Sequence, residues 1–385
     1  MDELEEYRGE IDKIDEELTG LFCRRMEITG KVGAYKLRTK LPVLDAARQR
    51  TLLAAKTALV EDPGRKAEVA SLFETIMGIS RRQQRNLVHE GAENPGYRAY
   101  LAARGNLRDP IAAPRVVYQG EPGAYSEAAS MDFFGKEVRA QGLPRFEDAF
   151  LALESGRADY AVLPIENSST GSIRQVYDLL AQYAYHIVGE TQVKVEHCLM
   201  ALPGVELDEI TTVYSHEQGL SQSQQFLAGH PAWQQIPTLD TAGSARQVAQ
   251  RGDRTAAAIC SRRAAELYGL NILAEKVNFN AENQTRFVVI SPCPERREGC
   301  DKISALLTLP HQSGSLHEIL TLFAVQGLNL LKLESRPISG RNWEYLFFLE
   351  FSGDLSAPGM DGLLCELSQL AADMRILGNF KACGG

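Results

Sequence analysis

The sequence predicts a multidomain protein with an all-α segment first, an α/β region next and a small α+β domain last. Three observations support this fold class. Apolar residues near the N-terminus repeat every three or four positions, short apolar strands alternate with helices through the middle, and the tail follows the order βαββαβ. The 385 residues suffice for two to three domains.

Residues 1–90 are expected to form three helices, the first of which is unusually long. It begins at Leu4, repeats apolar residues three or four positions apart, and ends close to Pro42. At 1.5 Å per residue such a helix spans roughly 50 Å. The second and third helices are expected at 45–59 and 66–88. So long a helix with few internal partners suggests packing against another chain.

The pattern of apolar residues changes in the middle of the chain, after a segment rich in glycine and proline. Residues 91–114 predict a linker with one helical turn, and residues 115–292 predict an α/β region with a largely parallel sheet. The expected strands are 115–119, 161–164, 186–195, 211–214 and 256–260. The expected helices are 126–134, 146–155, 173–181, 217–227 and 243–251.

The tail, residues 301–383, follows a second boundary at 292–300, where prolines and a glycine gather. Its expected elements are strand 302–309, helix 315–326, strand 328–337, strand 343–351, helix 359–372 and strand 374–380. This order in about 80 residues is typical of a ferredoxin-like domain.

Composition excludes several classes of function. The formal net charge is -9, with 41 basic and 50 acidic residues, which argues against a nucleic-acid surface or a polybasic membrane face. Apolar runs are too short to span a bilayer and the first residues are acidic, so we expect a cytoplasmic protein. The seven cysteines show no CxxC and no metal-ligand spacing, which favours reduced thiols.

Two cations share one face of the long first helix. Arg25 occupies a position of the apolar stripe, and Lys36 lies eleven residues on, about 16 Å away and nearly in line with it. Together they could bracket a small dianion, although Arg25 could instead extend to solvent or pair with a structural carboxylate. Arg8 lies about 25 Å from Arg25 along the axis, so another chain must supply it to the same ligand.

These residues belong to a longer pattern. It consists of Arg8, Ile11, Asp12, Asp15, Leu18, Arg25, Met26, Val32, Lys36, Pro42, Val43, Asp45, Arg48 and Arg50. The pattern resembles the all-helical chorismate mutases, and the resemblance implies an intertwined helical dimer in which Arg8 reaches the partner's site. The substrate-binding residues it implies are Arg8, Arg25, Lys36, Asp45, Arg48, Gln49, Ser80 and Gln84, of which Arg25, Lys36 and Gln84 are catalytic.

The reaction that this resemblance implies needs no proton transfer. Rearranging chorismate to prephenate requires a folded substrate and donors at the oxygen that gains charge, so neither metal nor cofactor is expected. Gln49 stands where the family commonly has glutamate, and it keeps an acceptor oxygen without the charge. For Ser80 and Gln84 taken alone, a solvated helix face is the alternative.

Three polar segments mark strand ends of the α/β region, at 164–172, 214–222 and 284–287. Ligand crevices form at such ends, although helix capping or turn chemistry explains each segment taken alone. Together with 119–126 they resemble prephenate dehydratase, whose fold is similar to two-lobed periplasmic solute-binding proteins. The triplet at 285–287, Thr-Arg-Phe, is the most diagnostic feature of that family.

The resemblance implies loss of CO2 and water from prephenate to give phenylpyruvate, with Thr285 as the catalytic residue. The implied substrate-binding residues are Glu166, Asn167, Ser168, Ser215, Gln222, Thr285 and Arg286. A threonine hydroxyl is a weak acid, so Glu166 and His216 are candidate proton donors. His216 could equally be a structural imidazole, and Arg286 either a carboxylate partner or a structural ion pair.

Segments of the tail resemble the ACT regulatory domains of prephenate dehydratases, which bind phenylalanine between paired domains. They are 314–317, 327–330 and 334–337. The implied phenylalanine-binding residues are Gly314, Ser315, Leu316, Asn329, Leu330, Glu334 and Ser335. A dimerisation module with an inert pocket is the alternative.

The resemblance covers nearly the whole chain in the usual order of the family. We therefore expect a bifunctional chorismate mutase and prephenate dehydratase that is regulated by phenylalanine and forms an even-numbered homo-oligomer, a dimer or tetramer. One alternative is an arogenate-type dehydratase with a degenerate mutase domain. Another is a catalytically inactive sensor of aromatic or amino acids, because a fold does not guarantee a function.

Overall fold

The computed structural model describes residues 3–41, 43, 45–88, 95–312, 314–338, 340 and 344–384. The chain divides into two compact units. The first comprises 1–98, 309–326 and 361–374, and the second comprises 99–308, 327–360 and 375–385. Within the described residues, no helix is both long and apolar enough to cross a lipid bilayer.

The first helix, α1 (Glu3–Thr39), is continuous over 37 residues, which confirms the long helix expected from Leu4. Acidic residues occupy its first turn and basic residues its last turn, an arrangement that stabilises both ends of the helix dipole. Pro42, where the sequence placed the end of this helix, lies outside the described residues.

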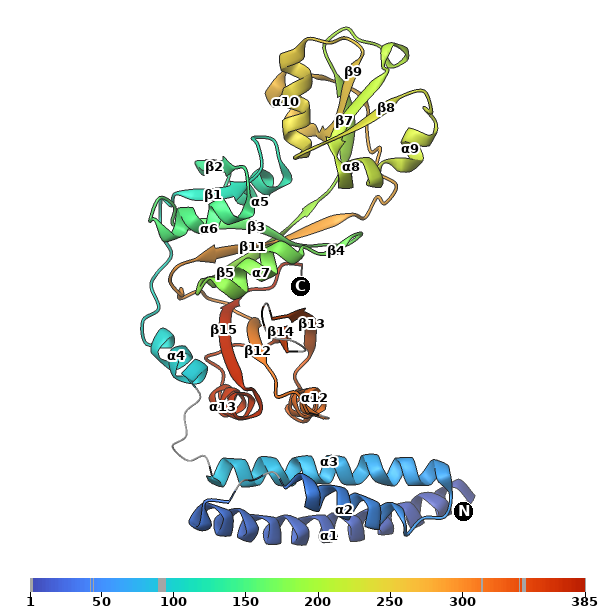
Figure 1. Ribbon diagram of the computed structural model, residues 1–385, viewed down its shortest axis with the longest axis vertical. Coiled ribbons are helices and arrows are strands. Elements are labelled where there is room, and N and C mark those ends of the chain that lie inside the picture. The colour runs from blue at the N-terminus through green and yellow to red at the C-terminus, as the bar shows by residue number, and fades with distance from the viewer. Residues whose placement is uncertain are drawn as a thin grey trace. The chain divides into compact units, whose positions relative to one another are not determined.

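Two further helices belong to the first unit (Figure 1). Helix α3 (Pro63–Val88) packs against α1, and α2 (Ala46–Thr57) packs against α3. The expectation that the third helix begins at residue 66 was wrong by three positions. Pro63 is tolerated in the first turn because its missing N–H needs no partner there, and Asp62 Oδ1 accepts from the N–H of Arg65 at 3.0 Å.

Helix α1 approaches α3 closely where it carries a glycine. A Cβ on Gly33 would lie 3.0 Å from a methyl carbon of Leu87 and 3.2 Å from the Gln84 side chain. The expected linker holds a longer helix than one turn, α4 (Pro95–Arg104). Alanine, leucine and arginine dominate the second half of α4, and these are strong helix formers.

The second unit contains a sheet in the strand order β2-β1-β3-β11-β5, with β4 paired to β3. Its strands are β1 (Val116–Gln119), β2 (Ala140–Leu143), β3 (Tyr160–Asn167), β4 (Gly171–Ser172), β5 (His186–Lys194) and β11 (Gln284–Ser291). Its helices are α5 (Tyr125–Phe134), α6 (Phe146–Glu154) and α7 (Arg174–Gln182). This sheet and its helices make the first lobe.

A second sheet, in the order β10-β6-β9-β7-β8, makes the second lobe (Figure 1). Its strands are β6 (His197–Ala201), β7 (Thr212–His216), β8 (Gln234–Thr238), β9 (Ala256–Ser261) and β10 (Asn271–Ala274). Its helices are the short 3-10 helix η1 (Leu207–Glu209), α8 (Glu217–Gln222), α9 (Gln224–Ala228), α10 (Thr241–Arg251) and α11 (Arg262–Tyr268). The helix expected at 217–227 is interrupted at Ser223, between α8 and α9.

The expectation of a largely parallel sheet was wrong, because both sheets are mixed. Strand β1 pairs in parallel with β2 and β3, and β7 pairs in parallel with β8 and β9. Strand β11 is antiparallel to both β3 and β5. The chain leaves the first lobe through β5 and returns through β11, and a returning strand beside an outgoing one pairs antiparallel.

The tail follows the expected order of elements, and its strands form a third sheet in the order β13-β14-β12-β15. In chain order the elements are β12 (Lys302–Thr308), α12 (Ser315–Val325), β13 (Leu330–Pro337), β14 (Tyr345–Ser352), α13 (Met360–Leu370) and β15 (Asp373–Phe380). One hydrophobic core contains residues of this sheet and of the first lobe, and the rings of Tyr177 and Phe348 meet there at 4.8 Å.

Candidate active sites

The helical unit places a partly buried cation between α1 and α3. Arg25 donates a hydrogen bond from Nη1 to Oγ of Ser80, which is 5% exposed. Burial lowers the pKa of Arg25, and no carboxylate among the described residues pairs with it. The positive charge is therefore destabilised in the free protein and would be stabilised by an anionic ligand.

Two more expected residues lie on α1 and α3. Lys36 donates from Nζ to the carbonyl of Val43 at 2.7 Å. Gln84 is buried against Gly33, and within the described part of the chain its Oε1 has no hydrogen-bond partner. The packing of α1 on α3 thus brings Arg25, Ser80 and Gln84 to one helix–helix interface. Among the described residues, the charge of Arg25 has no carboxylate partner there and Oε1 of Gln84 has no hydrogen-bond partner.

The expected residues of α2 already have protein partners. Asp45 caps this helix and accepts from the N–H of Arg48 at 2.9 Å. Gln49 accepts from Nη1 of Arg81 at 3.0 Å. Arg8 is exposed and pairs with Glu5 at 2.6 Å, one helical turn from itself. Because α1 is unbroken, Arg8 remains about 25 Å from Arg25 within one chain.

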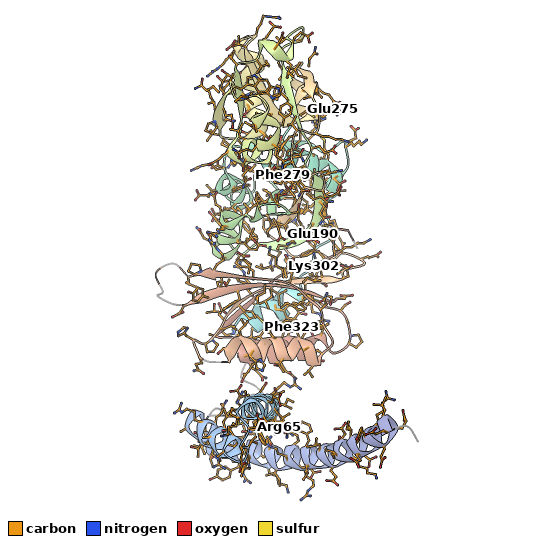
Figure 2. All side chains as sticks on the ribbon, turned by 90° about the vertical axis from the view of Figure 1, so that its right-hand side faces the viewer. Arg65, Glu190, Glu275, Phe279, Lys302 and Phe323 are labelled. Carbon is orange, nitrogen blue, oxygen red and sulfur yellow. The ribbon has the colours of Figure 1, made fainter. Side chains whose placement is uncertain are left out.

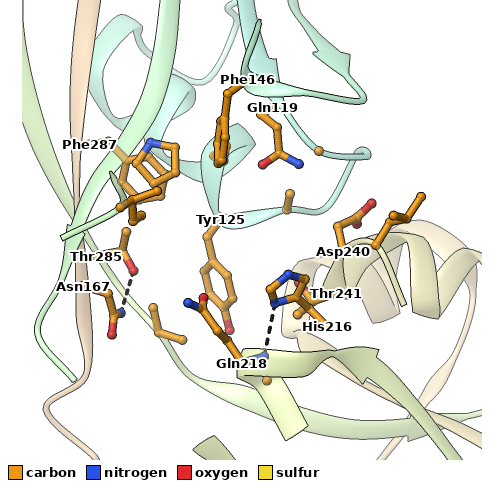
Figure 3. Close-up of a pocket in the computed structure, with 18 of the residues that line it drawn as sticks. Gln119, Tyr125, Phe146, Asn167, His216, Gln218, Asp240, Thr241, Thr285 and Phe287 are labelled. Atoms are coloured by element: carbon orange, nitrogen blue, oxygen red, sulfur yellow. Dashed lines mark hydrogen bonds between the residues drawn. The ribbon is translucent and has the colours of Figure 1, made fainter. Parts of the chain in front are cut away.

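The two-lobed region contains a cavity of about 420 Å³, and both sheets contribute to its lining (Figure 3). Asn167 comes from the end of β3, Thr285 and Phe287 come from β11, and Tyr125 comes from α5 of the first lobe. His197, His216 and Gln222 come from the second lobe. Of the seven expected substrate residues, the cavity lining includes Asn167, Gln222 and Thr285.

His197 also lines the cavity, although no sequence motif had pointed to it. Its Nδ1 lies 3.1 Å from the hydroxyl of Tyr125 and its Nε2 lies 3.0 Å from Oε1 of Gln222. Burial lowers the pKa of His197 to about 4, with the Gln222 contact opposing the shift, so the ring is neutral near pH 7. The sequence signal that could have indicated this residue is a histidine directly before the apolar run 198–201.

His216 also lines the cavity, and its Nδ1 caps α8 by accepting from the N–H of Gln218 at 3.2 Å. The structural role considered for this imidazole is therefore present. Ser215, the residue before it, is fully buried and donates to the carbonyl of Ile259 at 2.7 Å. This hydroxyl, expected to bind substrate, is bonded within the second lobe and is not part of the cavity lining.

Glu166, Ser168 and Arg286 were also expected in the substrate site, and none of the three lines the cavity. Successive residues of a strand point to opposite faces, so Arg286 faces away where Thr285 faces the cavity, and Glu166 and Asn167 divide in the same way. Ser168 instead accepts from the N–H of Gln284 at 3.0 Å.

Arg286 is the centre of a buried cluster of charges. Its guanidinium donates to Glu190 at 2.9 Å, to Glu350 of β14 at 3.0 Å and to Glu166 at 3.0 Å. Lys302 contacts Glu190 at 2.5 Å, and Figure 2 labels these two side chains next to each other. Of the two readings of Arg286 from sequence, the structure supports the ion pair.

These contacts also decide the protonation of the two carboxylates. Burial would raise the pKa of Glu166, but hydrogen bonds from Lys332 and Arg286 outweigh it, so the pKa is lowered. Burial would likewise raise the pKa of Glu190, and the charges of Arg286 and Lys302 lower it. Glu166 is thus ionised near neutral pH and is a poor proton donor.

The residues expected to bind phenylalanine fall in both units. Gly314 precedes α12 with φ of +89°, a conformation that glycine adopts without strain, and Ser315 begins that helix. In the second unit, Glu334 lies on β13 and accepts from Ser172 at 2.9 Å.

Groups of three or more potential metal ligands are absent from the described residues.

Comparison with known proteins shows which family combines these two regions. Residues 7–85 match the family model for chorismate mutase type II, and residues 116–295 match the model for prephenate dehydratase. A bifunctional chorismate mutase/prephenate dehydratase from Escherichia coli K12 is 34% identical over 384 residues, which cover 97% of this chain and 95% of that protein. The chain belongs to the bifunctional chorismate mutase/prephenate dehydratase family.

Two other relatives cover the part of this bifunctional enzyme after the helical segment. Arogenate dehydratase 3 from Arabidopsis thaliana is 39% identical over 288 residues, 69% of this chain and 66% of that protein. The structure of a prephenate dehydratase in complex with L-Phe, from Arthrobacter aurescens, is 30% identical with a TM-score of 0.64. It covers 70% of this chain and 90% of that one, and it supports the two-lobed fold.

As a chorismate mutase, the enzyme isomerises chorismate to prephenate, and as a prephenate dehydratase, it is a lyase that converts prephenate to phenylpyruvate, CO2 and water. The two reactions are consecutive, because the product of the first is the substrate of the second.

Proposed function

We propose that the seam between α1 and α3 carries the mutase reaction and that the cavity between the lobes carries the dehydratase reaction. One observation supports each assignment. Arg25 is a partly buried cation without a carboxylate partner among the described residues, and it bonds Ser80 of α3, the helix on which Oε1 of Gln84 also lacks a described partner. Thr285 places a hydroxyl on the wall of the cavity (Figure 3).

At the mutase site, Arg25 and Lys36 hold the carboxylates and ether oxygen of a folded chorismate, and Ser80 orients Arg25. The breaking C–O bond gives its oxygen negative charge, so preorganised cations lower the barrier without transferring a proton. Gln84 contributes its side-chain amide to the same substrate. Asp45, Arg48 and Gln49 close the pocket from α2 once the substrate competes for their present partners.

At the dehydratase site, Thr285 donates a hydrogen bond to the ring hydroxyl of prephenate. The electrons of the departing carboxylate enter the ring, the ring C–O bond breaks, and the leaving hydroxide takes one proton to become water. Because the imidazole of His197 is neutral, it serves with Tyr125 and Gln222 as a fixed polar wall. The proton comes from solvent through the hydrogen-bonded groups of the cavity.

The active mutase is a dimer in this proposal. Large apolar side chains at helical spacing along α1 are about half exposed in the single chain, at Leu4, Tyr7, Ile11, Ile14, Leu18, Leu21, Ile28, Val32 and Tyr35. A second copy of α1 would bury this stripe and carry its own Arg8 to the partner's site.

Ile14→Glu should dissociate the dimer, because the stripe would then bury a charge. We expect a monomer by sedimentation and a mutase activity reduced at least tenfold, with the dehydratase activity retained. Glu16→Lys, on the opposite side of α1, is the matched control and should remain dimeric. A wild-type chain that is monomeric and fully active as a mutase contradicts the shared site.

The tail is proposed to be an ACT-type, ferredoxin-like domain that binds phenylalanine and inhibits the dehydratase. The strand order of the third sheet supports this proposal, as does the likeness to a dehydratase structure with L-Phe. The binding residues we propose are Gly314, Ser315, Leu316, Asn329, Leu330, Glu334 and Ser335. Phenylalanine must then bind one arrangement of the lobes more tightly than another.

Chorismate fed to the purified enzyme should yield prephenate and then phenylpyruvate, and phenylalanine should slow the second step. Thr285→Ala should accumulate prephenate, because losing a donor to a charged leaving group costs about 1.5–3 kcal/mol, roughly 10- to 150-fold in rate. An unchanged rate in Thr285→Ala rejects the proposed dehydratase site. Turnover of arogenate but not of prephenate would reverse the substrate assignment.

A further inference from the structure

The side-chain amide of Asn167 is held in one orientation by its neighbours. Its Oδ1 accepts from the backbone N–H groups of Ser169 at 3.0 Å and Thr170 at 3.1 Å, and from the Thr170 hydroxyl at 3.2 Å. Backbone N–H groups can only donate, so the oxygen of the amide must face this turn. The Nδ2 group must therefore face the other way, toward β11.

The two protons on Nδ2 of Asn167 have defined acceptors. One is donated to Oγ1 of Thr285 at 2.9 Å, the contact drawn as a dashed line in Figure 3. The other lies between Oδ1 of Asn283 at 2.9 Å and the carbonyl of Gln284 at 3.1 Å. Asn283 is 1% exposed, so this support is shielded from water.

Thr285 is consequently an acceptor in its contact with Asn167. Its own hydroxyl proton has to point elsewhere, and the described residues offer no acceptor for it. The backbone of Thr285 is paired on both sides, with Asn167 of β3 and Val193 of β5, so the residue cannot shift along the sheet. The free O–H therefore points into the cavity that Thr285 lines.

We propose that Asn167 is a positioning residue, which acts by holding the Thr285 hydroxyl as a donor toward the substrate rather than by binding the substrate itself. This inference rests on the proposed dehydratase site. It revises the substrate-binding role expected of Asn167, although that side chain also lines the cavity. A donor that is already oriented needs no rearrangement as charge develops on the leaving oxygen.

Asn167→Asp isolates the donor, because aspartate keeps the volume and the oxygen that faces the turn. When ionised, its second oxygen accepts the Thr285 proton and turns that hydroxyl away from the substrate; when protonated, it can donate again. We expect the dehydratase kcat to fall about 100-fold at pH 8 and to recover at least tenfold at pH 5.5, while the wild type shows no such recovery. Prephenate without enzyme serves as the blank at each pH.

A double-mutant cycle tests whether Asn167 acts through Thr285. Asn167→Ala should lower kcat about tenfold with KM changed less than twofold, and it should have less than a twofold effect in the Thr285→Ala background. Asn106→Ala, which removes an exposed amide bonded to the carbonyl of Ala102, is the matched control and should keep wild-type kcat.

Three results would overturn the proposal: a raised KM with unchanged kcat in Asn167→Ala, multiplicative losses in the cycle, or a parallel pH profile in Asn167→Asp. If Asn167→Ala does not fold, the pH profile of Asn167→Asp decides alone. If Thr285→Ala is itself fully active, the proposed site fails as well. If only the Asn167 variants behave like the wild type, the positioning role fails and the proposed site stands.

Discussion

Replacing Arg286 by methionine is expected to lower the free energy of unfolding of the second unit by about 3–5 kcal/mol. The guanidinium touches three carboxylates, and the side chain of Glu190 among them is fully buried. Without Arg286, Glu190 and Glu350 would face each other with Lys302 as the shared cation. Since whole domains are stable by only about 5–15 kcal/mol, this is a large effect.

Urea unfolding, followed by circular dichroism and by residual dehydratase activity, measures the loss. Arg115→Met is the matched control, because its guanidinium is 60% exposed and pairs with Asp159 on the surface at 2.7 Å. Such a surface pair contributes about 0–1 kcal/mol. Equal midpoints for the Arg286 and Arg115 variants would show that the buried cluster contributes little.

The same cluster predicts how stability depends on pH. The pKa values of Glu166 and Glu190 are lowered in the folded protein from their ordinary 4.5. A lowered carboxyl pKa adds stability above the unfolded pKa and loses it as pH falls through the folded pKa. The difference in the free energy of unfolding between wild type and Arg286→Met should therefore become smaller below pH 4.5. A constant difference down to pH 3 would contradict this origin.

Arg25→Ala is expected to lower the mutase kcat/KM by roughly 10²–10³, about 3–4 kcal/mol of transition-state stabilisation. Ser80 holds Arg25 in place, and burial destabilises the charge of Arg25 until an anion binds beside it. Substitution by alanine leaves no cation at this point of the α1–α3 seam to meet the oxygen that gains charge.

Steady-state kinetics with chorismate measures this loss. Arg24→Ala removes the neighbouring exposed cation and should retain wild-type mutase activity. The dehydratase activity of Arg25→Ala, assayed with added prephenate, checks that the rest of the chain is folded. A loss of less than twofold in chorismate turnover would remove Arg25 from the mutase mechanism.

Local patterns predicted most elements because periodicity depends on neighbours in sequence. The apolar spacing of α1, the cap at Asp45 and the order of the tail elements were all readable in this way. Strand order and direction were not, because the return of β11 between β3 and β5 joins segments far apart in the chain.

The candidate sites divide along the same line. The polar strand ends pointed to Thr285 and Asn167, both of which line the cavity. Neighbours such as Thr285 and Arg286 were expected in one site, although their side chains point to opposite faces of the strand. His197 was missed because its partners, Tyr125 and Gln222, lie 72 and 25 residues away.

The sequence alone therefore determined the family, the order of the domains and the residue types for chemistry on anions, since these depend on local strings. Only the tertiary structure decided that Arg286 joins a buried charge cluster and that Asn167 donates to Thr285. Both outcomes depend on which face of a strand meets the cavity and on contacts between distant segments. Neither the face that a strand turns to the cavity nor a contact between distant segments can be read from neighbouring residues.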